Sequence, residues 1–398
     1  MKSSKANIGS IWEVFVVALK LGLTSFGGPI AHIGYFHAEY VQRKKWLDDR
    51  SFSDLVALCQ LLPGPASSQL GIGIGTIRCG LWGGIAAWLG FTLPSALLLI
   101  LFQMWLGRSD VASAPWIQGL KLVALVVVFQ AVLGMWSKLI RGPQLATIAL
   151  GVLAVNLAWS GSVAQIASIA VSAMFGLVFL KQPSDPPPAV FVIGYGKRFG
   201  AAILVVFLSL LVSLPLLNEF LGGLYLRMAD GFYRAGSLVF GGGHVVLPFL
   251  EKEFVGQGAM SKEVFLAGYG AVQAVPGPLF TLSAFIGMSI SGIGGALVGL
   301  VAMFLPAYLL MVGALPFWDT LRKSQKLSGV LIAINAAVVG ILLAALYDPI
   351  WLASVHRPID LAFGSILAIQ LVVWKGSPVV TVGIGVAGSV LLSQIGVF

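Results

Sequence analysis

Charged residues are scarce in this sequence, and their scarcity excludes a soluble fold. Lys, Arg, Asp and Glu make up only 10% of the 398 residues, against about 25% in soluble domains. Hydrophobic residues make up 58% and the mean hydropathy is +0.96, so lipid must solvate much of the chain. The apolar runs are continuous, as in 201–217 and 296–315, whereas the strands of a membrane barrel alternate polar and apolar positions. The sequence therefore predicts an all-α polytopic membrane protein with the lipid bilayer as a partner.

Groups that carry catalysis or hold metals are also few. The cysteines, Cys59 and Cys79, lie within or beside apolar segments and show no metal or redox spacing. His32 and His244 have no second ligand at helical spacing, and no Walker-type phosphate loop is present. We therefore expect no enzyme activity, no metal and no cofactor. The net charge of +9 is scattered through short loops, as the positive-inside rule produces, so nucleic acid is not an expected partner.

Hydropathy and loop charges together predict thirteen apolar segments. They run approximately over residues 11–26, 52–77, 80–106, 115–137, 143–160, 161–180, 199–217, 222–240, 263–290, 292–314, 328–347, 359–374 and 377–397. With the N-terminus in the cytoplasm, most Lys and Arg residues fall in inner loops. The loop 37–51 is the exception, because it carries four basic residues on the outer side; it is either a surface-lying amphipathic piece or a sign of different threading.

Short motifs recur in the two halves of the chain at an offset of 212 to 214 residues. Chance similarity between apolar helices would not hold such an offset. The recurring pairs are Phe26-Gly27-Gly28 with Phe240-Gly241-Gly242, Glu39 with Glu253, Gln60 with Gln273, Pro63-Gly64-Pro65 with Pro276-Gly277-Pro278, and Gly80, Gly83 and Pro94 with Gly292, Gly295 and Pro306. We expect two inverted repeats of about six segments each, because one linking helix (199–217) between them makes the number of crossings odd.

The repeat also defines the domains. An N-terminal repeat is expected over 1–180, and a linking helix with a C-terminal repeat over 199–398. The linker 181–198 contains four prolines, which favour an extended, semi-rigid spacer. An inverted repeat can complete a site within one chain, so both a monomer and a homodimer agree with this organisation.

Each half places a Pro-Gly-Pro motif inside an apolar segment, at 63–65 and 276–278. Proline removes a backbone donor, and glycine permits dihedrals that a helix does not use, so each motif predicts a broken or re-entrant helix. Such breaks must be buried or line a wet cavity, and half-helix N-termini bind anions. The alternative is a simple kink, but two motifs at matching positions favour a substrate site. The candidate residues are Gln60, Pro63, Gly64, Pro65, Ser67, Ser68, Gln69, Gln273, Pro276, Gly277, Pro278, Thr281 and Ser283.

The Phe-Gly-Gly motifs form a second pair of breaks, and a cation stands six residues before each of them. These cations are Lys20 and Arg234. A charge inside a membrane helix costs at least about 2.5–3.5 kcal/mol on insertion scales, so we expect the two cations to converge on one anion. Snorkelling to the interface is the alternative for Lys20. The glycines of these breaks complete the candidate substrate site: Gly27, Gly28, Gly241 and Gly242.

Glu39 and Glu253 are the acidic residues that match across the repeat. They can gate the site, carry protons for coupling, or form ion pairs with basic loop residues. The ion-pair interpretation is favoured, because charged residues near membrane segments usually pair with one another.

Taken together, these motifs resemble the chromate ion transporter family, in its long, two-domain bacterial type. Phe26-Gly27-Gly28-Pro29, Glu39 and Leu62-Pro63-Gly64-Pro65 are similar to its N-terminal motifs. Phe240-Gly241-Gly242-Gly243-His244 and Val275-Pro276-Gly277-Pro278 are similar to its C-terminal ones. The likeness spans nearly the whole chain.

The resemblance implies a secondary transporter of the bacterial inner membrane that exports chromate, with sulfate as a competing analogue, and so confers chromate resistance. Chromate and sulfate share charge and tetrahedral shape, so a site of dipoles and cations would separate them only weakly. Uptake of sulfate or another oxyanion, and an oxyanion channel, are the alternatives.

Overall fold

A computed structural model describes residues 8–26, 28–107, 115–159, 162–180, 191, 193–240, 243–318 and 325–395. Within these ranges all regular secondary structure is helical, which confirms the predicted fold class. Over the same ranges, five helical stretches are long and apolar enough to cross a membrane, and shorter apolar helices accompany them. These five are Ala66–Leu106, Pro115–Leu139, Lys197–Leu221, Leu279–Phe317 and Gly329–Ser354. The protein is therefore a multi-pass membrane protein.

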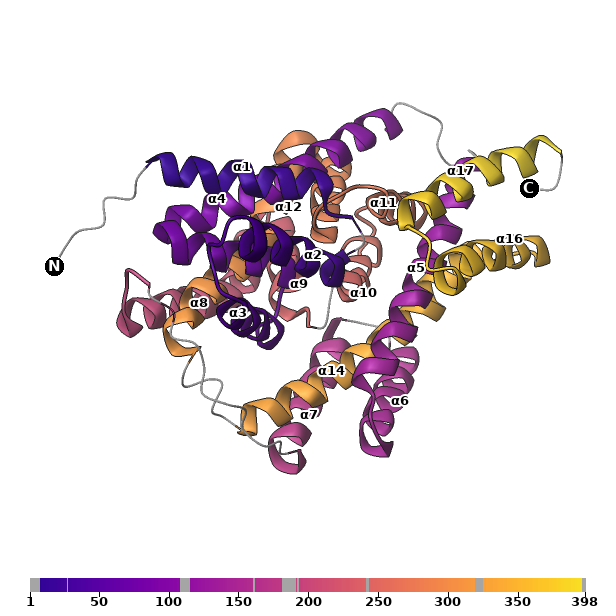
Figure 1. The fold of residues 1–398 in the computed structure, drawn as a ribbon. Coiled ribbons are helices and arrows are strands. Elements are labelled where there is room, and N and C mark those ends of the chain that lie inside the picture. Colours follow the sequence, from indigo (N-terminus) through magenta and orange to yellow (C-terminus); the bar gives the residue numbers. More distant parts are fainter. Residues whose placement is uncertain are drawn as a thin grey trace.

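The two halves contain similar successions of elements (Figure 1). The N-terminal half comprises α1 (Ile8–Thr24), α2 (Gly28–Phe36), η1 (His37–Arg43), α3 (Asp49–Leu61), α4 (Ala66–Leu106), α5 (Pro115–Leu139), α6 (Pro143–Ala158) and α7 (Ser162–Phe179). The linking helix is α8 (Lys197–Leu221). The C-terminal half comprises α9 (Leu224–Leu238), η3 (Gly243–Val245), α10 (Val246–Leu250), η4 (Glu251–Val255), α11 (Lys262–Val272), η5 (Leu279–Thr281), α12 (Leu282–Ala314), η6 (Leu315–Phe317), α14 (Gln325–Ala345), η7 (Leu346–Trp351), α15 (Leu352–Ser354), α16 (Pro358–Ala368), η8 (Ile369–Val373) and α17 (Pro378–Gln394).

Most predicted segments agree with these helices to within a few residues, with two exceptions. Segments 52–77 and 263–290 are each divided between two helices at the Pro-Gly-Pro motif. Of the predicted linker, residues 181–190 and 192 lie outside the described residues, and α8 begins inside its predicted end.

The segment 37–51, predicted to be a loop, is partly helical. It contains η1, which is a π-helix, and the first turn of α3. The matching segment of the other repeat, η4, is also a π-helix. These short elements carry the matched glutamates, Glu39 and Glu253, and hydropathy missed them because they are polar. π-Helical turns are rare and occur frequently at functional sites.

In each repeat the first helix is followed by elements that fold back on it, α2 and η1 after α1, and η3, α10 and η4 after α9. Lys20 of α1 contacts Glu39 of η1 at 2.6 Å, and Glu13, about two turns earlier in α1, contacts Lys44 at 2.9 Å. This order of contacts requires α1 and α2–η1 to run antiparallel. An equivalent ion pair joins α9 to η4 in the C-terminal repeat. We call these two units the first hairpins.

The chain folds back again at each Pro-Gly-Pro motif. A Cβ atom added to Gly73 in α4 would lie 3.0 Å from Leu55 of α3, and one added to Gly268 in α11 would lie 2.2 Å from Phe285 of α12. Each pair flanks its motif by a similar number of residues, so the two arms lie side by side. We call these two units the second hairpins, and their geometry confirms the predicted re-entrant helices.

The tips of the second hairpins depend on glycine. Gly64 has a φ of 120° and Gly277 a φ of 98°, values that residues with a Cβ rarely adopt. The arm α3 has 13 residues, or about 20 Å of helix, which is shorter than the ~30 Å hydrocarbon core. Each tip can therefore lie at membrane depth.

The helices α4 and α12 each turn sharply once more. Gly80 and Gly292 have φ values of 68° and 61° within them. Gly287 and Gly295 lie on either side of the turn in α12 and approach closely. A Cβ atom added to Gly287 would lie 2.1 Å from the carbonyl oxygen of Gly295. Small residues at such contacts let helix backbones approach in membrane proteins.

The repeats exchange their packing partners. The helix α5 packs against α16 and α17 of the C-terminal repeat, whereas α14 packs against α6 and α7 of the N-terminal repeat. These helices lie on one side of the molecule in Figure 1, and α1–α4, α8, α9 and α12 gather on the other. The helices α4 and α12 also pack against each other. Each repeat therefore buries the apolar faces of the other.

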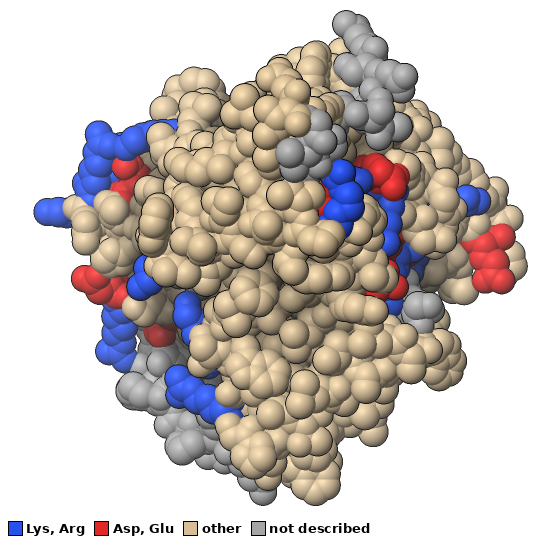
Figure 2. Space-filling view, turned by 90° about the vertical axis from the view of Figure 1, so that its right-hand side faces the viewer, with Lys and Arg blue, Asp and Glu red and all other residues tan. Residues whose placement is uncertain are grey.

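The outer surface is apolar, as lipid requires. Figure 2 shows one face on which uncharged residues predominate and charged residues form a few small groups. Large apolar side chains are exposed, among them Val163 at 77% and Phe220 at 81%. Exposure to water would be unfavourable by about 25 cal/mol per Å² of apolar area, whereas lipid accepts these side chains.

We expect Gly287→Ala to destabilise the protein, because the added methyl group meets a backbone carbonyl that cannot easily move. Overpacking costs typically about 1–3 kcal/mol, so thermal unfolding in detergent should show a clearly lower midpoint. Gly151→Ala in α6 is the matched control, since nothing lies within 4 Å of its Cβ position. Equal behaviour of the two variants would contradict the close turn within α12.

Candidate functional site

The hairpin tips of one repeat meet those of the other. The backbone N–H of Gly277, in the second hairpin of the C-terminal repeat, donates to the carbonyl oxygen of Ser25 at 2.9 Å. The N–H of Gly64, in the second hairpin of the N-terminal repeat, donates to the carbonyl oxygen of Val239 at 2.6 Å. Ser25 and Val239 each precede a Phe-Gly-Gly motif. Such reciprocal contacts are those that a two-fold axis between inverted repeats produces. We call them the Ser25 crossing and the Val239 crossing.

Two half-helix N-termini begin at these tips. The helix α4 starts at Ala66, directly after the first Pro-Gly-Pro motif, and η5 leads into α12 directly after the second. The first N–H groups of a helix have no intrahelical partner, and the N-terminal end carries partial positive charge. The centre of the protein therefore offers two electropositive helix ends, which is the environment that anions prefer.

Most of the candidate residues at the second breaks are buried at this centre. Buried or partly buried positions are Pro63, Gly64, Pro65, Ser67, Ser68, Gln69, Gln273, Pro276, Gly277, Pro278, Thr281 and Ser283. The hydroxyls of Ser68 and Ser283 have no hydrogen-bond partner among the described residues. That of Thr281 donates to the carbonyl oxygen of Pro278 at 2.7 Å, which repairs the broken backbone.

The two matched glutamines occupy different environments. Gln60 is exposed, whereas Gln273 is buried and donates through Nε2 to the carbonyl oxygen of Tyr269 at 3.3 Å. Of the candidate glycines at the first breaks, Gly28 is described and has a φ of 79°. Gly27, Gly241 and Gly242 lie outside the described residues.

Lys20 forms an ion pair within its own repeat. Its Nζ lies 2.6 Å from Glu39 Oε2, and Arg43 approaches the same oxygen at 3.3 Å. The carboxylate is largely buried, but the Lys20 side chain is 46% exposed. The pair joins the two arms of the first hairpin.

Arg234 forms a stronger version of the same contact. Its guanidinium donates to both carboxylate oxygens of Asp230, at 2.7 and 2.9 Å, and to Glu253 at 3.0 Å. Both carboxylates are almost fully buried and the arginine is mostly so. Asp230 was missed from the sequence, although its position one helical turn before Arg234 was a usable signal.

Lys20 and Arg234 therefore each face a carboxylate 19 residues further along the chain. Their partners lie on the neighbouring arm of their own hairpin, and both partners are the matched glutamates. An anion that approaches either cation must compete with this carboxylate.

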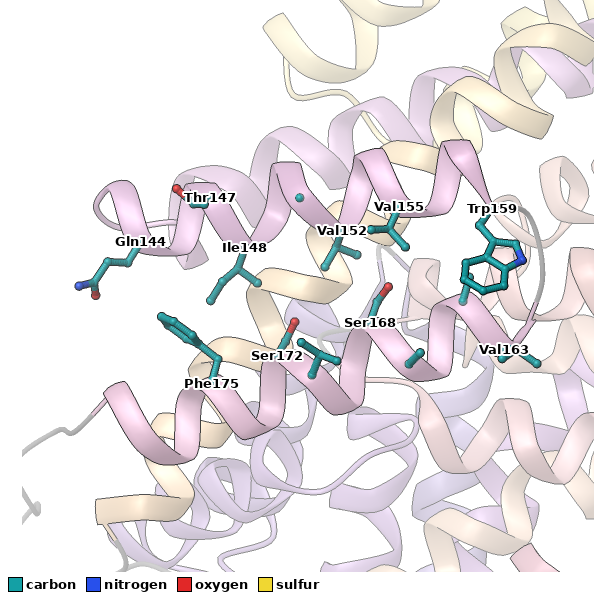
Figure 3. A pocket seen from close by; sticks show the side chains of 14 residues that line it. Gln144, Thr147, Ile148, Val152, Val155, Trp159, Val163, Ser168, Ser172 and Phe175 are labelled. Atoms are coloured by element: carbon teal, nitrogen blue, oxygen red, sulfur yellow. The ribbon is translucent and has the colours of Figure 1, made fainter.

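Two cavities away from the hairpin tips are poorly suited to an oxyanion. An apolar groove of about 640 Å³ lies between α6 and α7, where Ile148, Val152 and Val155 face Ser172 and Phe175 (Figure 3). None of the described residues that line it is charged.

The second cavity, of about 410 Å³, is lined by Glu251, Lys252 and Asp348 among others. Its two acidic groups and one basic group disfavour a dianion.

No group of three or more His, Cys, Asp or Glu side chains among the described residues is placed to hold a metal ion. Cys59 and Cys79 are buried free thiols, which is typical of cysteines that serve in packing.

Broken-helix hairpins inside apolar segments, repeats related by reciprocal contacts and an apolar outer surface together define a membrane transporter built from two repeats. Comparison with known families identifies the family to which this transporter belongs. The chromate transporter family model matches residues 12–195 and 226–390, so the chain belongs to the chromate transporter family. This membership indicates a transporter and not an enzyme.

Relatives match over most of their own length. The chain is 28% identical to a chromate transport protein of Pseudomonas aeruginosa, over 94% of this chain and 90% of the relative. It is 29% identical to a probable chromate transport protein of Synechococcus elongatus, over 81% of each. A chromate transport protein of Cupriavidus metallidurans is 28% identical over 84% of this chain and 81% of its own length.

We expect Arg234→Met to destabilise the protein far more than Lys20→Met. Removing Arg234 leaves two buried carboxylates without their cation, and breaking a buried pair costs about 3–5 kcal/mol. Lys20 is half-exposed, and exposed pairs contribute about 0.2–1 kcal/mol. The amount of folded protein after membrane extraction and its unfolding midpoint measure the difference.

The triple variant Arg234→Met, Asp230→Asn, Glu253→Gln is the control, because it removes the uncompensated charges. It should recover most of the stability that Arg234→Met loses. Equal loss in Arg234→Met and Lys20→Met would show that the two ion pairs do not differ in this way.

Proposed function

We propose that this protein is a secondary transporter that exports chromate from the bacterial cytoplasm across the inner membrane, with sulfate as a competitor, and so confers chromate resistance. The observation that carries the proposal is the pairwise contact between hairpin tips of opposite repeats, Gly277 with Ser25 and Gly64 with Val239, in a chain of the chromate transporter family. Relatives named as chromate transport proteins over most of their length support the choice of substrate.

The proposed substrate site lies among the hairpin tips. The helix ends at Ala66 and Leu279 supply N–H donors and positive dipole ends. The hydroxyls of Ser67 and Ser68 belong to the same proposed site, as do the glycines of the first breaks, Gly27, Gly28, Gly241 and Gly242. Rocking of one repeat against the other gives alternating access in inverted-repeat transporters, and the two crossings are the contacts between repeats that such a movement must disturb.

The direction follows from charge. Export of a dianion from a cell that is negative inside is downhill by about 2.3 kcal/mol per charge per 100 mV. The potential therefore suffices as a driving force.

The N-terminus is proposed to be cytoplasmic. The proposed domains are the N-terminal repeat (1–180), the linker (181–198) and the C-terminal unit (199–398).

In this proposal the matched glutamates, Glu39 and Glu253, neutralise the cations Lys20 and Arg234. Glu39 neutralises Lys20, which is the more exposed of the two cations, so Lys20 is the one available to an incoming anion. Arg234 is held by two carboxylates and serves mainly to brace its hairpin. The pairing with carboxylates keeps the site from retaining its anion too tightly for release.

Inside-out vesicles that contain the protein should take up radiolabelled chromate with saturation. Excess sulfate should block the uptake, because the two anions share charge and shape. An interior-positive potential should accelerate it, since it draws a dianion inward. Vesicles without the protein are the control. No uptake by correctly inserted protein would remove the chromate assignment, and uptake without saturation would indicate a channel.

Lys20→Ala should lower chromate transport at least tenfold while the protein stays inserted, because a charge-assisted contact is lost. Glu39→Gln should instead increase the affinity for chromate, because it frees Lys20 from its carboxylate. Equal losses in both variants would mean that the pair only braces the hairpin. Lys44→Ala is the matched control, since Lys44 pairs with Glu13 in the same hairpin, and its transport should stay within about twofold of the parent.

A further inference from the structure

The two crossings are related by the repeat but differ in chemistry. At the Ser25 crossing, Ser95 lies against Gly277, and two more polar residues are close by: His32, whose ring packs on Phe91, and Thr92, which follows Phe91 in α4. All four are buried, with exposures of 0% for Ser25, 1% for His32, 3% for Thr92 and 1% for Ser95. Four buried polar side chains at one contact between repeats need an explanation, because a buried polar group without a hydrogen-bond partner destabilises the fold.

The equivalent positions at the Val239 crossing are all apolar. With the offsets of the repeat, Ser25, His32, Thr92 and Ser95 correspond to Val239, Val246, Phe304 and Ala307. These four residues are also fully buried, around Gly64 in place of Gly277. The fold therefore tolerates apolar side chains at every one of these positions, and the polar set is not required for folding.

Contacts show that the polar residues gather at one place. A Cβ added to Gly277 would lie 3.0 Å from Ser95 Oγ and 3.2 Å from the carbonyl oxygen of Phe91. The His32 ring packs edge-on against Phe91 with 5.4 Å between centroids. Ser95 Oγ donates to the carbonyl oxygen of Thr92 at 3.1 Å. Thr92 and Ser95 lie one turn apart on α4, so they share a face.

Most of this hydrogen-bonding capacity is unused. Ser25 Oγ, Thr92 Oγ1 and both ring nitrogens of His32 have no hydrogen-bond partner among the described residues. His32 lies close to the backbone of Ser25 but makes no well-formed hydrogen bond with it. An unsatisfied buried group costs about 1–3 kcal/mol, so these atoms are available to a ligand that would satisfy them.

At the Val239 crossing the four positions that match Ser25, His32, Thr92 and Ser95 offer an anion no side-chain donor, because they carry Val239, Val246, Phe304 and Ala307. The side chain of Gln69 lies there, 3.0 Å from the Cβ position of Gly64. Its Nε2 donates to the carbonyl oxygen of Pro63 at 2.7 Å, and only its Oε1, an acceptor, is left without a partner. An acceptor oxygen repels an oxyanion.

We propose that the transported tetrahedral oxyanion binds off the two-fold axis, at the Ser25 crossing, and that the Val239 crossing is a closed contact between the repeats. The hydroxyls of Ser25 and Thr92 and one N–H of His32 donate to the anion. The N–H of Gly277 becomes a further donor when its bond to Ser25 opens. The side-chain donors at this crossing are neutral, and Lys20 remains the cation available to the incoming anion. This assignment rests on the proposed function.

Equilibrium binding of radiolabelled chromate and sulfate to the purified full-length protein tests the assignment. Ser25→Ala, Thr92→Val and His32→Phe should each raise the Kd for both anions about tenfold or more, as expected when a hydrogen bond to a charged group is lost. Thr92→Ser, which keeps the hydroxyl, should bind close to the parent affinity. Val246→Thr and Phe304→Leu are the controls at the Val239 crossing, and their affinities should stay within about threefold of the parent.

Sulfate-dependent thermal stabilisation of the same samples gives a second readout, which counts only folded protein. If the parent protein transports and binds chromate but Ser25→Ala and Thr92→Val behave like the two controls, the Ser25 crossing is not the site and the proposed function stands. If the controls lose affinity and the Ser25-crossing variants do not, the anion binds at the other crossing. If the parent neither binds nor transports chromate or sulfate, both the assignment and the proposed function fail.

Discussion

The two backbone hydrogen bonds between hairpin tips are the contacts on which the rest of the structure depends. A helix broken inside a bilayer exposes N–H and C=O groups that lipid cannot satisfy. Gly64 and Gly277 resolve this by donating to carbonyls of the opposite repeat. Because each repeat both donates and accepts, neither can keep its broken helices at membrane depth without the other. The packing of α5 against the C-terminal repeat and of α14 against the N-terminal repeat makes the two repeats depend on each other in the same way.

The ion pairs of the two first hairpins occupy equivalent positions but differ in burial and in the number of carboxylates around the cation. Lys20 with Glu39 and Arg234 with Glu253 occupy equivalent places across the first hairpins. The second pair gains Asp230 and is buried, whereas the first remains half-exposed. A lysine acts as a mobile point charge and an arginine as a rigid fork, so the cation of the N-terminal hairpin is held less tightly than that of the C-terminal hairpin.

The same divergence appears at the crossings. Gene duplication produces two equivalent contacts, and a symmetric pair of sites would place like-charged anions close together, where they repel each other. Polar side chains at the Ser25 crossing and apolar ones at the Val239 crossing avoid that repulsion. The repeat thus supplies the same backbone contact twice, with different side chains around each copy.

Composition, hydropathy and the internal repeat determined the helical membrane class, most helix positions and the breaks at Pro63–Pro65 and Pro276–Pro278, because these properties depend on local chemistry. The polar π-helices η1 and η4 escaped detection because hydropathy registers only apolar runs. Tertiary structure decided which groups meet. Lys20 and Arg234 were expected to share an anion, yet each faces a carboxylate on the adjacent arm, since the chain folds back between the cation and the carboxylate. Nor does a sequence of apolar helices reveal that Gly277 lies against Ser25, because contacts between distant segments are set by how the repeats pack and not by their spacing.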